Sequence, residues 1–277
     1  MKQEQSKPLE HWGLERWPFP SVPSAGLIYP SAGHEEALAR IDYLVGTQRR
    51  LGVLLGEVGI GKTLTLQAAA RQMARQRQAV VIVDALGLGT REMLWQVAAG
   101  LGAAPDIHAE LPKLWRLVAD RVIENRWQQI DTVLIVDDAG QVGPDLATQL
   151  TRLSRIDPTP AARWTILLAA EADQVGRWGE TLRELVDLRI ELMPWDDADV
   201  VGFLQSALVE AGREEPLFDD DALEALSELS GGIPRRLARL ADLAMLAGAA
   251  ARAATVDASL VHAADDEVRW YAPARVF

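Results

Sequence analysis

The stretch Gly56-Glu57-Val58-Gly59-Ile60-Gly61-Lys62-Thr63 decides the fold, because it matches the pattern G-x-x-x-x-G-K-S/T at every fixed position. Glycines let the backbone curl so that successive N–H groups point inward at phosphate oxygens. The helix expected from Leu64 onward adds unpaired amides and the positive end of its dipole. In such a loop Lys62 reaches the β- and γ-phosphates and the Thr63 hydroxyl is a ligand of Mg²⁺. We therefore expect residues 56–64 to bind ATP together with Mg²⁺.

Apolar runs of strand length alternate with helical patterns along the first two thirds of the chain. These runs are Leu51–Leu55, Val80–Val83, Val133–Val136, Ile166–Ala169 and, more weakly, Leu188–Leu192. The first run directly precedes the glycine-rich stretch. Near-continuous apolar strands separated by amphipathic helices are typical of a parallel sheet covered on both faces. The sequence therefore predicts an α/β fold with a phosphate-binding loop after its first strand.

Two carboxylates, Asp137 and Asp138, follow the apolar run Val133–Val136. Ligands of open α/β sheets lie outside the carboxyl ends of the strands, so both carboxylates are expected near the phosphates. Asp137 is a candidate ligand of Mg²⁺, directly or through water, and Asp138 is a candidate to polarise the attacking water. An acidic turn after a strand is common in itself, and the preceding phosphate loop gives this one its weight.

The character of the sequence changes after Pro194, where strand-like runs end. Helical segments are expected at Asp197–Ala211, Asp220–Leu229, Pro234–Leu246 and Val256–Ala264. Gly212 directly follows the first of these as its expected C-terminal cap.

The amino-terminal residues are rich in proline and tryptophan and predict an irregular, extended lead-in. We expect Trp12, Trp17 and Phe19 to pin it across the sheet or to form a partner surface. The predicted organisation is a lead-in (1–33), an α/β nucleotide-binding domain (34–194), a helical domain (195–267) and a tail (268–277).

Charge and composition exclude several classes of protein. The formal net charge is −12, which argues against a whole-surface attraction to nucleic acid or anionic membrane. No cysteine is present, so disulfides and thiolate metal sites are excluded. No stretch has the pattern of a membrane span or a secretory signal, and we expect a cytoplasmic location, with the inner face of the membrane as an alternative. The four histidines lack metal-ligand spacing, and we interpret His34 as a residue that caps or orients its helix.

Several motifs together resemble the general secretion pathway protein A family of ExeA-like ATPases. They are His11-Trp12-Gly13-Leu14 with Pro18-Phe19, Leu27-Ile28-Tyr29-Pro30-Ser31, His34-Glu35-Glu36-Ala37-Leu38 and the phosphate loop. The resemblance extends from about His11 to near Ala249. It implies the AAA+ fold of P-loop NTPases, with a five-stranded parallel sheet of order 5-1-4-3-2 and a small C-terminal helical lid.

The stretch Gly232-Ile233-Pro234-Arg235 is similar to the start of a lid helix in that family. The resemblance implies that Pro234 and Arg235 bind nucleotide and that Arg235 acts as sensor 2 on the γ-phosphate. Arg235 and Arg236 also lie in the first turn of an expected helix, where the helix dipole opposes positive charge. Residues placed against a local preference are often functional. An exposed surface arginine is the other interpretation.

Three further residues are candidates for the nucleotide site. Arg189 resembles the arginine of the family's Q-R-I segment, which implies a finger that reaches the nucleotide of a neighbouring subunit. Ile28 and Tyr29 immediately precede the first expected helix, and we regard them as candidates to flank the adenine.

Two positions depart from the family pattern. Asp137-Asp138-Ala139-Gly140 stands where the family has D-E-A-Q. Because aspartate is one methylene shorter than glutamate, we expect the carboxylate of Asp138 to lie about 1 Å short of the position that the family's glutamate reaches. This predicts slow, partner-stimulated hydrolysis. Glu171 stands where the family has the neutral amide of sensor 1, and a carboxylate beside the γ-phosphate is unfavourable unless Mg²⁺ or an arginine offsets it. The identity of sensor 1 therefore stays open.

Three functions remain in view, each of which uses ATP and Mg²⁺. The first is an ExeA-like ATPase that acts, as a homo-oligomeric ring or filament, on a protein complex near the cell envelope. The second is a DNA-associated regulator of the TniB/TnsC type. The double aspartate favours it, and so does the lack here of the membrane span found in longer family members. The net charge opposes it. Retention of duplex DNA at low salt distinguishes these two. The third is a nucleotide-gated scaffold with little turnover.

Overall fold

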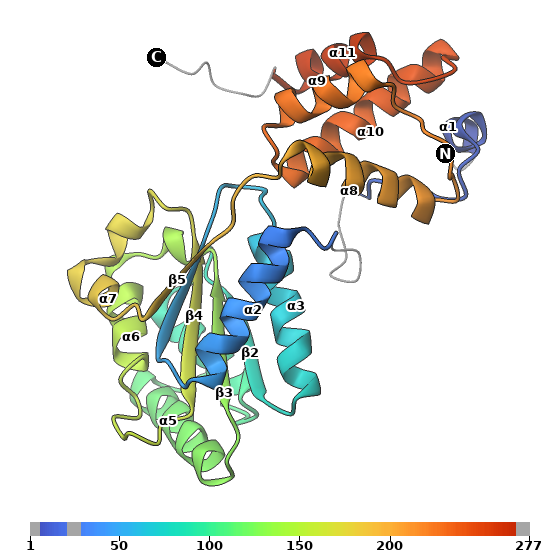
Figure 1. The fold of residues 1–277 in the computed structure, drawn as a ribbon. Helices are drawn as coiled ribbons and strands as arrows, with labels where there is room; N and C mark the ends of the chain where they lie inside the picture. Colours follow the sequence, from blue (N-terminus) through green and yellow to red (C-terminus); the bar gives the residue numbers. More distant parts are fainter. Residues whose placement is uncertain (1–5, 21–28, 270–277) are drawn as a thin grey trace. The chain divides into compact units, whose positions relative to one another are not determined.

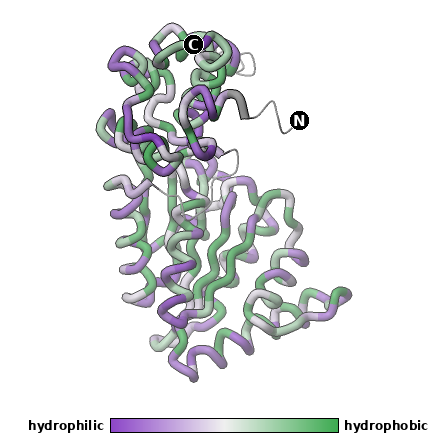
Figure 2. The backbone as a smooth tube through the Cα atoms, turned by 90° about the vertical axis from the view of Figure 1, so that its right-hand side faces the viewer, coloured by the Kyte–Doolittle hydropathy of each residue, from purple (hydrophilic) through white to green (hydrophobic). Residues whose placement is uncertain are grey.

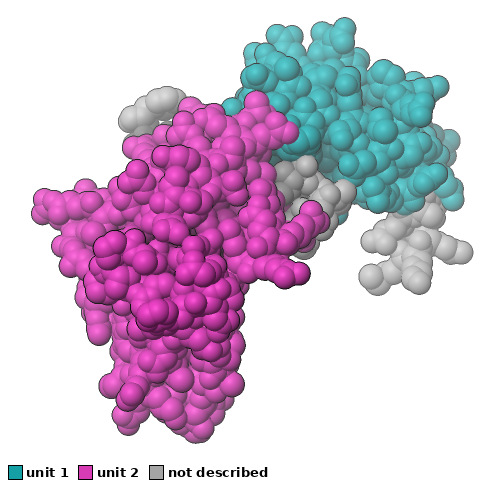
Figure 3. Space-filling model, turned by 60° about the horizontal axis from the view of Figure 1, so that its bottom comes forward, with its two compact units in different colours: residues 1–31, 194–277 teal, residues 32–193 magenta. Residues whose placement is uncertain are grey.

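The computed structural model describes residues 6–20 and 29–269, and these form two compact units. One unit comprises Ala32–Met193 and is called here the α/β unit. The other comprises Met1–Ser31 together with Pro194–Phe277 and is called the helical unit. Figure 3 colours the two units separately, and each is described by itself.

The α/β unit is built on a five-stranded sheet in which every pair of neighbouring strands is parallel. Its strands are β1 (Leu51–Leu55), β2 (Ala79–Asp84), β3 (Thr132–Asp137), β4 (Trp164–Ala170) and β5 (Leu188–Glu191). The spatial order is β2-β3-β4-β1-β5, which is the predicted order 5-1-4-3-2 read from the other edge. The predicted fold class is therefore confirmed.

Helices cover both faces of this sheet (Figure 1). They are α2 (Ala32–Gly46), α3 (Lys62–Arg75), α4 (Thr90–Gly100), α5 (Leu111–Trp127), α6 (Pro144–Leu153) and α7 (Glu180–Glu184), with the short 3₁₀ turns η1 (Ala139–Gln141) and η2 (Val175–Trp178). The strands are the most continuously hydrophobic segments of the unit (Figure 2), because they are buried between two helical layers.

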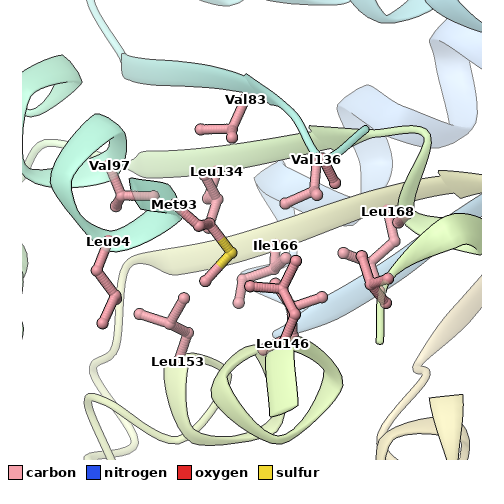
Figure 4. Close-up of a cluster of buried hydrophobic side chains, with 14 of the residues drawn as sticks. Val83, Met93, Leu94, Val97, Leu134, Val136, Leu146, Leu153, Ile166 and Leu168 are labelled. Atoms are coloured by element: carbon pink, nitrogen blue, oxygen red, sulfur yellow. The ribbon is translucent and has the colours of Figure 1, made fainter. Parts of the chain in front are cut away.

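The main core of the α/β unit lies between the sheet and the layer that contains α4 and α6. Figure 4 shows Met93, Leu94 and Val97 of α4 and residues of α6 meeting strand side chains of β2, β3 and β4. Leu134 and Leu168 are fully buried there. Dense packing of this kind holds the carboxyl ends of the strands at fixed spacings.

The helical unit contains α1 (Ser6–Trp12), α8 (Asp197–Glu210), α9 (Asp220–Ser230), α10 (Pro234–Ala251) and α11 (Ala258–Arg269). The carboxylates of Asp196 and Asp219 cap α8 and α9 by accepting backbone N–H groups of the first turn. Gly212, with φ +93°, follows α8 as predicted for a C-terminal cap.

The lead-in differs from the expected irregular segment. It contains helix α1, and helix α2 begins at Ala32, two residues before the predicted start of the nucleotide-binding domain at residue 34. Trp12 is 1% exposed and its Nε1 donates to the carbonyl of Met245 at 3.0 Å. Trp17 donates to Asp242, and Phe19 belongs to the same core of the helical unit. These aromatic residues therefore pack on α10 and its neighbours and do not cross the sheet.

Replacing Trp12 tests the anchoring of the lead-in. We expect Trp12→Ala to lower the free energy of unfolding by about 3–5 kcal/mol, because it removes a large buried side chain. The measurement is denaturant unfolding followed by circular dichroism. Trp127→Ala is the control, since Trp127 is 76% exposed. Equal effects of the two substitutions would show that Trp12 does not anchor the segment.

Candidate functional site

The glycine-rich loop connects the inner strand β1 with helix α3. Gly59 and Gly61 have φ values of +85° and +111°, a region in which a side chain is strained. At the start of the loop, the N–H of Gly56 donates to the carbonyl of Ala170 in β4 at 3.3 Å. Ile60 is buried beneath the loop. The loop is therefore anchored to the sheet at its first residue and by one apolar side chain.

The first residue of α3 is Lys62, and no side chain caps this helix. Its Nζ donates to the carbonyls of Gly56 at 2.9 Å and Glu57 at 3.0 Å, so the ammonium lies over the inner side of the loop. The side chain of Thr63 is exposed and Leu64 is half-buried. In contrast with α8 and α9, the first turn of α3 has its N–H groups without a carboxylate cap. Such a cradle fits the oxygens of a phosphate chain.

The carboxylates of Asp137 and Asp138, at the end of β3, lie at the same edge of the sheet as the glycine-rich loop. Asp137 is the last residue of β3 and is only 7% exposed. Strand β4 lies between β1 and β3. Neighbouring strands are about 4.8 Å apart, so the ends of β1 and β3 are separated by about 10 Å. That separation suits a hydrated Mg²⁺ that contacts a carboxylate on one side and phosphate oxygens on the other.

Asp138 has a left-handed backbone, with φ +49° and ψ +31°, and its N–H donates to Oδ1 of Asp137 at 3.0 Å. Among residues other than glycine, aspartate and asparagine tolerate this region best, because their short polar side chains form local hydrogen bonds. The backbone therefore gives a physical reason for the aspartate where the resembling family has glutamate.

His34, which the sequence led us to interpret as capping or orienting its own helix, lies against the glycine-rich loop. It belongs to α2, is 5% exposed, and forms a hydrogen bond with the backbone of Ile60. A Cβ atom on Gly61 would lie 2.6 Å from Nε2 of His34. The imidazole therefore forms a wall of the phosphate loop. Burial lowers the pKa of His34, and the hydrogen bond to Ile60 offsets this only in part, so the ring is kept neutral.

The two residues expected near the adenine have different outcomes. Ile28 lies outside the described residues. Tyr29 belongs to the helical unit, where its ring centroid is 5.4 Å from that of Trp195 and 6.2 Å from that of Phe203. Burial and the neighbouring carboxylates of Asp199 and Asp196 raise the pKa of Tyr29. Tyr29 thus lies in an aromatic cluster at the start of α8.

The arginines of the first turn of α10 have different environments. Arg236 lies 3.7 Å from the buried carboxylate of Asp265 in α11. Arg235 is exposed, and Pro234 occupies the first turn of the helix without an N–H group to satisfy. The helical unit therefore uses Arg236 in its own packing and leaves the guanidinium of Arg235 at the surface.

Arg189 lies on the edge strand β5 and is 60% exposed. It forms an ion pair of 3.0 Å with Glu191 on the same strand. Exposed pairs of this kind contribute about 0–1 kcal/mol, so Glu191 holds the guanidinium of Arg189 only weakly.

Comparison with known proteins agrees with this geometry. A family model described as an AAA domain matches residues 45–175. General secretion pathway protein A of Aeromonas hydrophila is 29% identical over 243 residues, which cover 86% of this chain and 44% of the relative. The chain thus spans less than half the length of that curated relative.

The chain contains a match to the AAA domain family and resembles general secretion pathway protein A.

Solved structures show the same fold. Cdc6p from Pyrobaculum aerophilum superposes with a TM-score of 0.68 at 18% identity, covering 89% of this chain and 72% of that one. ORC2 from Aeropyrum pernix gives 0.67 at 18% identity, covering 91% and 71%. RuvB from Thermotoga maritima, a Holliday junction branch migration motor, gives 0.55 at 16% identity, covering 86% and 70%. At these identities the likeness carries the fold alone.

Among the described residues, no helix is both long and apolar enough to cross a membrane.

The environment of His34 predicts a pH dependence of stability. In the unfolded chain the pKa of histidine is about 6.5, and burial lowers the pKa of His34 in the folded protein. The unfolded state therefore binds the proton more readily, and the stability contributed by neutral His34 is complete above pH 6.5 and is lost as the pH falls below it. We expect His34→Gln to reduce the acid-side decline in the free energy of unfolding, measured by denaturant titration at several pH values.

His108→Gln is the control, because His108 lies on an exposed loop. The prediction would be contradicted if the free energy of unfolding of the His34 variant declined with falling pH as steeply as that of the wild type. An equal change in the His108 variant would contradict it as well.

Proposed function

We propose that this AAA+ protein binds Mg-ATP at residues 56–64 and hydrolyses the bond between the β- and γ-phosphates. The single observation that supports this best is the form of the loop. The loop directly follows an inner strand of the sheet. Two of its glycines have positive φ, and they precede an uncapped helix that begins at Lys62. The chemistry of the surrounding donors fits the same substrate, since a cation and backbone N–H groups lie on one side and carboxylates on the other.

Each residue of the proposed site has a role that follows from its position. The N–H groups of residues 58–64 bind phosphate oxygens, and Lys62 exchanges its contacts with loop carbonyls for the β- and γ-phosphates. Thr63 and Asp137 would hold Mg²⁺, which supplies positive charge against the phosphate oxygens when bound. Asp138 orients the attacking water and accepts its proton.

The arginines are proposed to complete the site. Arg235, at the start of α10, supplies positive charge toward the γ-phosphate, and Arg189 does so from a neighbouring copy in a homo-oligomer. Pro234, Tyr29 and Ile28 belong to the proposed nucleotide contacts. Exposure of Arg235 and the weak surface pairing of Arg189 support these roles, because both guanidinium groups are accessible to an anion.

We further propose that the nucleotide state drives the assembly or remodelling of a protein complex at the cytoplasmic side of the cell envelope. The likeness to general secretion pathway protein A supports this partner class. ORC1 from Aeropyrum pernix, a structural neighbour of 15% identity and TM-score 0.62, was solved in complex with DNA. The formal net charge of −12 opposes a broad attraction of this chain to DNA, and we therefore rank a DNA-associated role second.

Binding of Mg-ATP is tested by removing the loop cation. We expect Lys62→Ala to weaken binding of a fluorescent ATP analogue by about 10-fold or more, because a hydrogen bond to a charged group contributes about 1.5–3 kcal/mol. Lys113→Ala is the matched control, since Lys113 is exposed on α5. Equal affinity of the Lys62→Ala variant and the wild type would exclude the proposed site.

Turnover is tested separately at Asp138. We expect Asp138→Asn to retain nucleotide affinity within about twofold and to lower phosphate release by about 100-fold or more, since general base catalysis contributes that much. Asp173→Asn, at an exposed position, is the control. A wild type that binds Mg-ATP tightly but releases no phosphate, alone or with its partner, would identify a nucleotide-gated scaffold.

A further inference from the structure

One glutamine side chain joins the loop after β3 to the end of β4. Gln174 precedes the turn η2, and its Nε2 donates to Oε1 of Glu171, the residue that follows β4. The same side chain lies over Gly140 in η1. A Cβ atom at position 140 would lie 2.8 Å from both Cβ and Cδ of Gln174 and closer still to its Oε1. No residue other than glycine therefore fits at position 140 while the side chain of Gln174 keeps this position.

A second contact holds the same loop from the same segment. Nε1 of Trp178, a buried residue of η2, donates to the carbonyl of Ala139 at 2.7 Å. Ala139 directly follows Asp138, and Gly140 comes next. The two contacts together fix the backbone on the carboxyl side of Asp138 against the segment that follows β4.

The amide is chemically suited to lie between two acidic loops. A carboxamide donates to a carboxylate through its NH₂ group and carries no charge of its own. Gln174 can thus orient Glu171 without altering the local charge balance around Asp137 and Asp138. An ammonium or guanidinium at this position would instead pair with these carboxylates and compete with Mg²⁺ for them.

We propose that Gln174 is a positioning residue for ATP hydrolysis, which sets the Asp138 loop against the end of β4 and orients Glu171. The inference rests on the proposed ATPase function. The phosphate loop is built from β1 and α3, whereas Gln174 contacts the loops that follow β3 and β4. Its loss therefore moves the water-activating carboxylate and leaves the phosphate contacts in place. Misplacement of a reacting group by about 1 Å costs on the order of 100-fold in rate.

The first test compares turnover with binding. In Gln174→Ala we expect kcat to fall about 10- to 100-fold, while KM and the Kd of a fluorescent ATP analogue stay within about twofold. Circular dichroism and a thermal midpoint establish that the variant is folded. An unchanged kcat, or an equal loss of nucleotide affinity, would overturn the inference.

The second test exchanges the two partners. Gln174→Glu keeps the size of the side chain but sets two carboxylates against each other, and we expect a loss of kcat at least as large as in the alanine variant. Adding Glu171→Gln restores an amide and a carboxylate in reversed positions, and we expect it to recover most of the lost kcat. A double variant as slow as Gln174→Glu would contradict a pairwise role, as in any double-mutant cycle.

Glycine variants test the packing against η1. Gly140→Ala is expected to lower kcat with little effect on nucleotide affinity, because the new methyl group displaces Gln174. Gly143→Ala is the control, since a Cβ there meets no atom within 4 Å. Equal kcat values for the two would overturn the inference.

Failure of the proposed function has a different signature. If the wild type and Lys62→Ala show the same phosphate release, there is no ATPase at residues 56–64 and both the function and the inference fall. If the wild type hydrolyses ATP, Lys62→Ala does not, and the Gln174 variants match the wild type, only the inference falls.

Discussion

The backbone conformation at Gly61 is the constraint on which the rest of the site depends. Its φ of +111° turns the chain from the loop into α3, which begins at the next residue, and so sets where the unpaired N–H groups of that helix point. The ring of His34 fills the space where a Cβ would be. Two independent demands, a left-handed backbone and room for an imidazole, therefore fall on one residue. Glycine alone satisfies both without strain.

The carboxyl edge of the sheet concentrates polar groups on a rigid base. The strands beneath it are buried through their length in β1, β3 and β4, and close packing fixes their spacing. Strand β4 stands between the strands that carry the loop and the carboxylates. It is therefore in a position to link them, through the hydrogen bond from Gly56 to Ala170 on one side and through Glu171 and Gln174 on the other. A short chain of contacts thus connects the glycine-rich loop with the residues that follow β3.

The structure offers local explanations for the positions at which this sequence departs from the pattern of the general secretion pathway protein A family. Aspartate at position 138 agrees with a left-handed backbone that a longer side chain adopts less readily. Glycine at position 140 leaves the space that the carboxamide of Gln174 occupies. Glu171 is held by that amide, so its carboxylate has a defined partner. In the helical unit, the ion pair of Arg236 with Asp265 accounts for one of two adjacent arginines, and the exposed Arg235 is the other.

The sequence by itself determined the five strands, the phosphate loop and the acidic pair, because each is encoded by residues that are contiguous in the chain. The resemblance supplied the strand order, which follows from βαβ connectivity shared across the fold. Short helices such as α1 and α7 escaped prediction, since 7 and 5 residues are too few to establish a helical period. The packing of Trp12 on α10, of His34 on Gly61 and of Gln174 on Gly140 was decided only by the tertiary structure. Each joins elements far apart in the sequence, and contact between them depends on how helices and loops pack around the sheet, which no local pattern records.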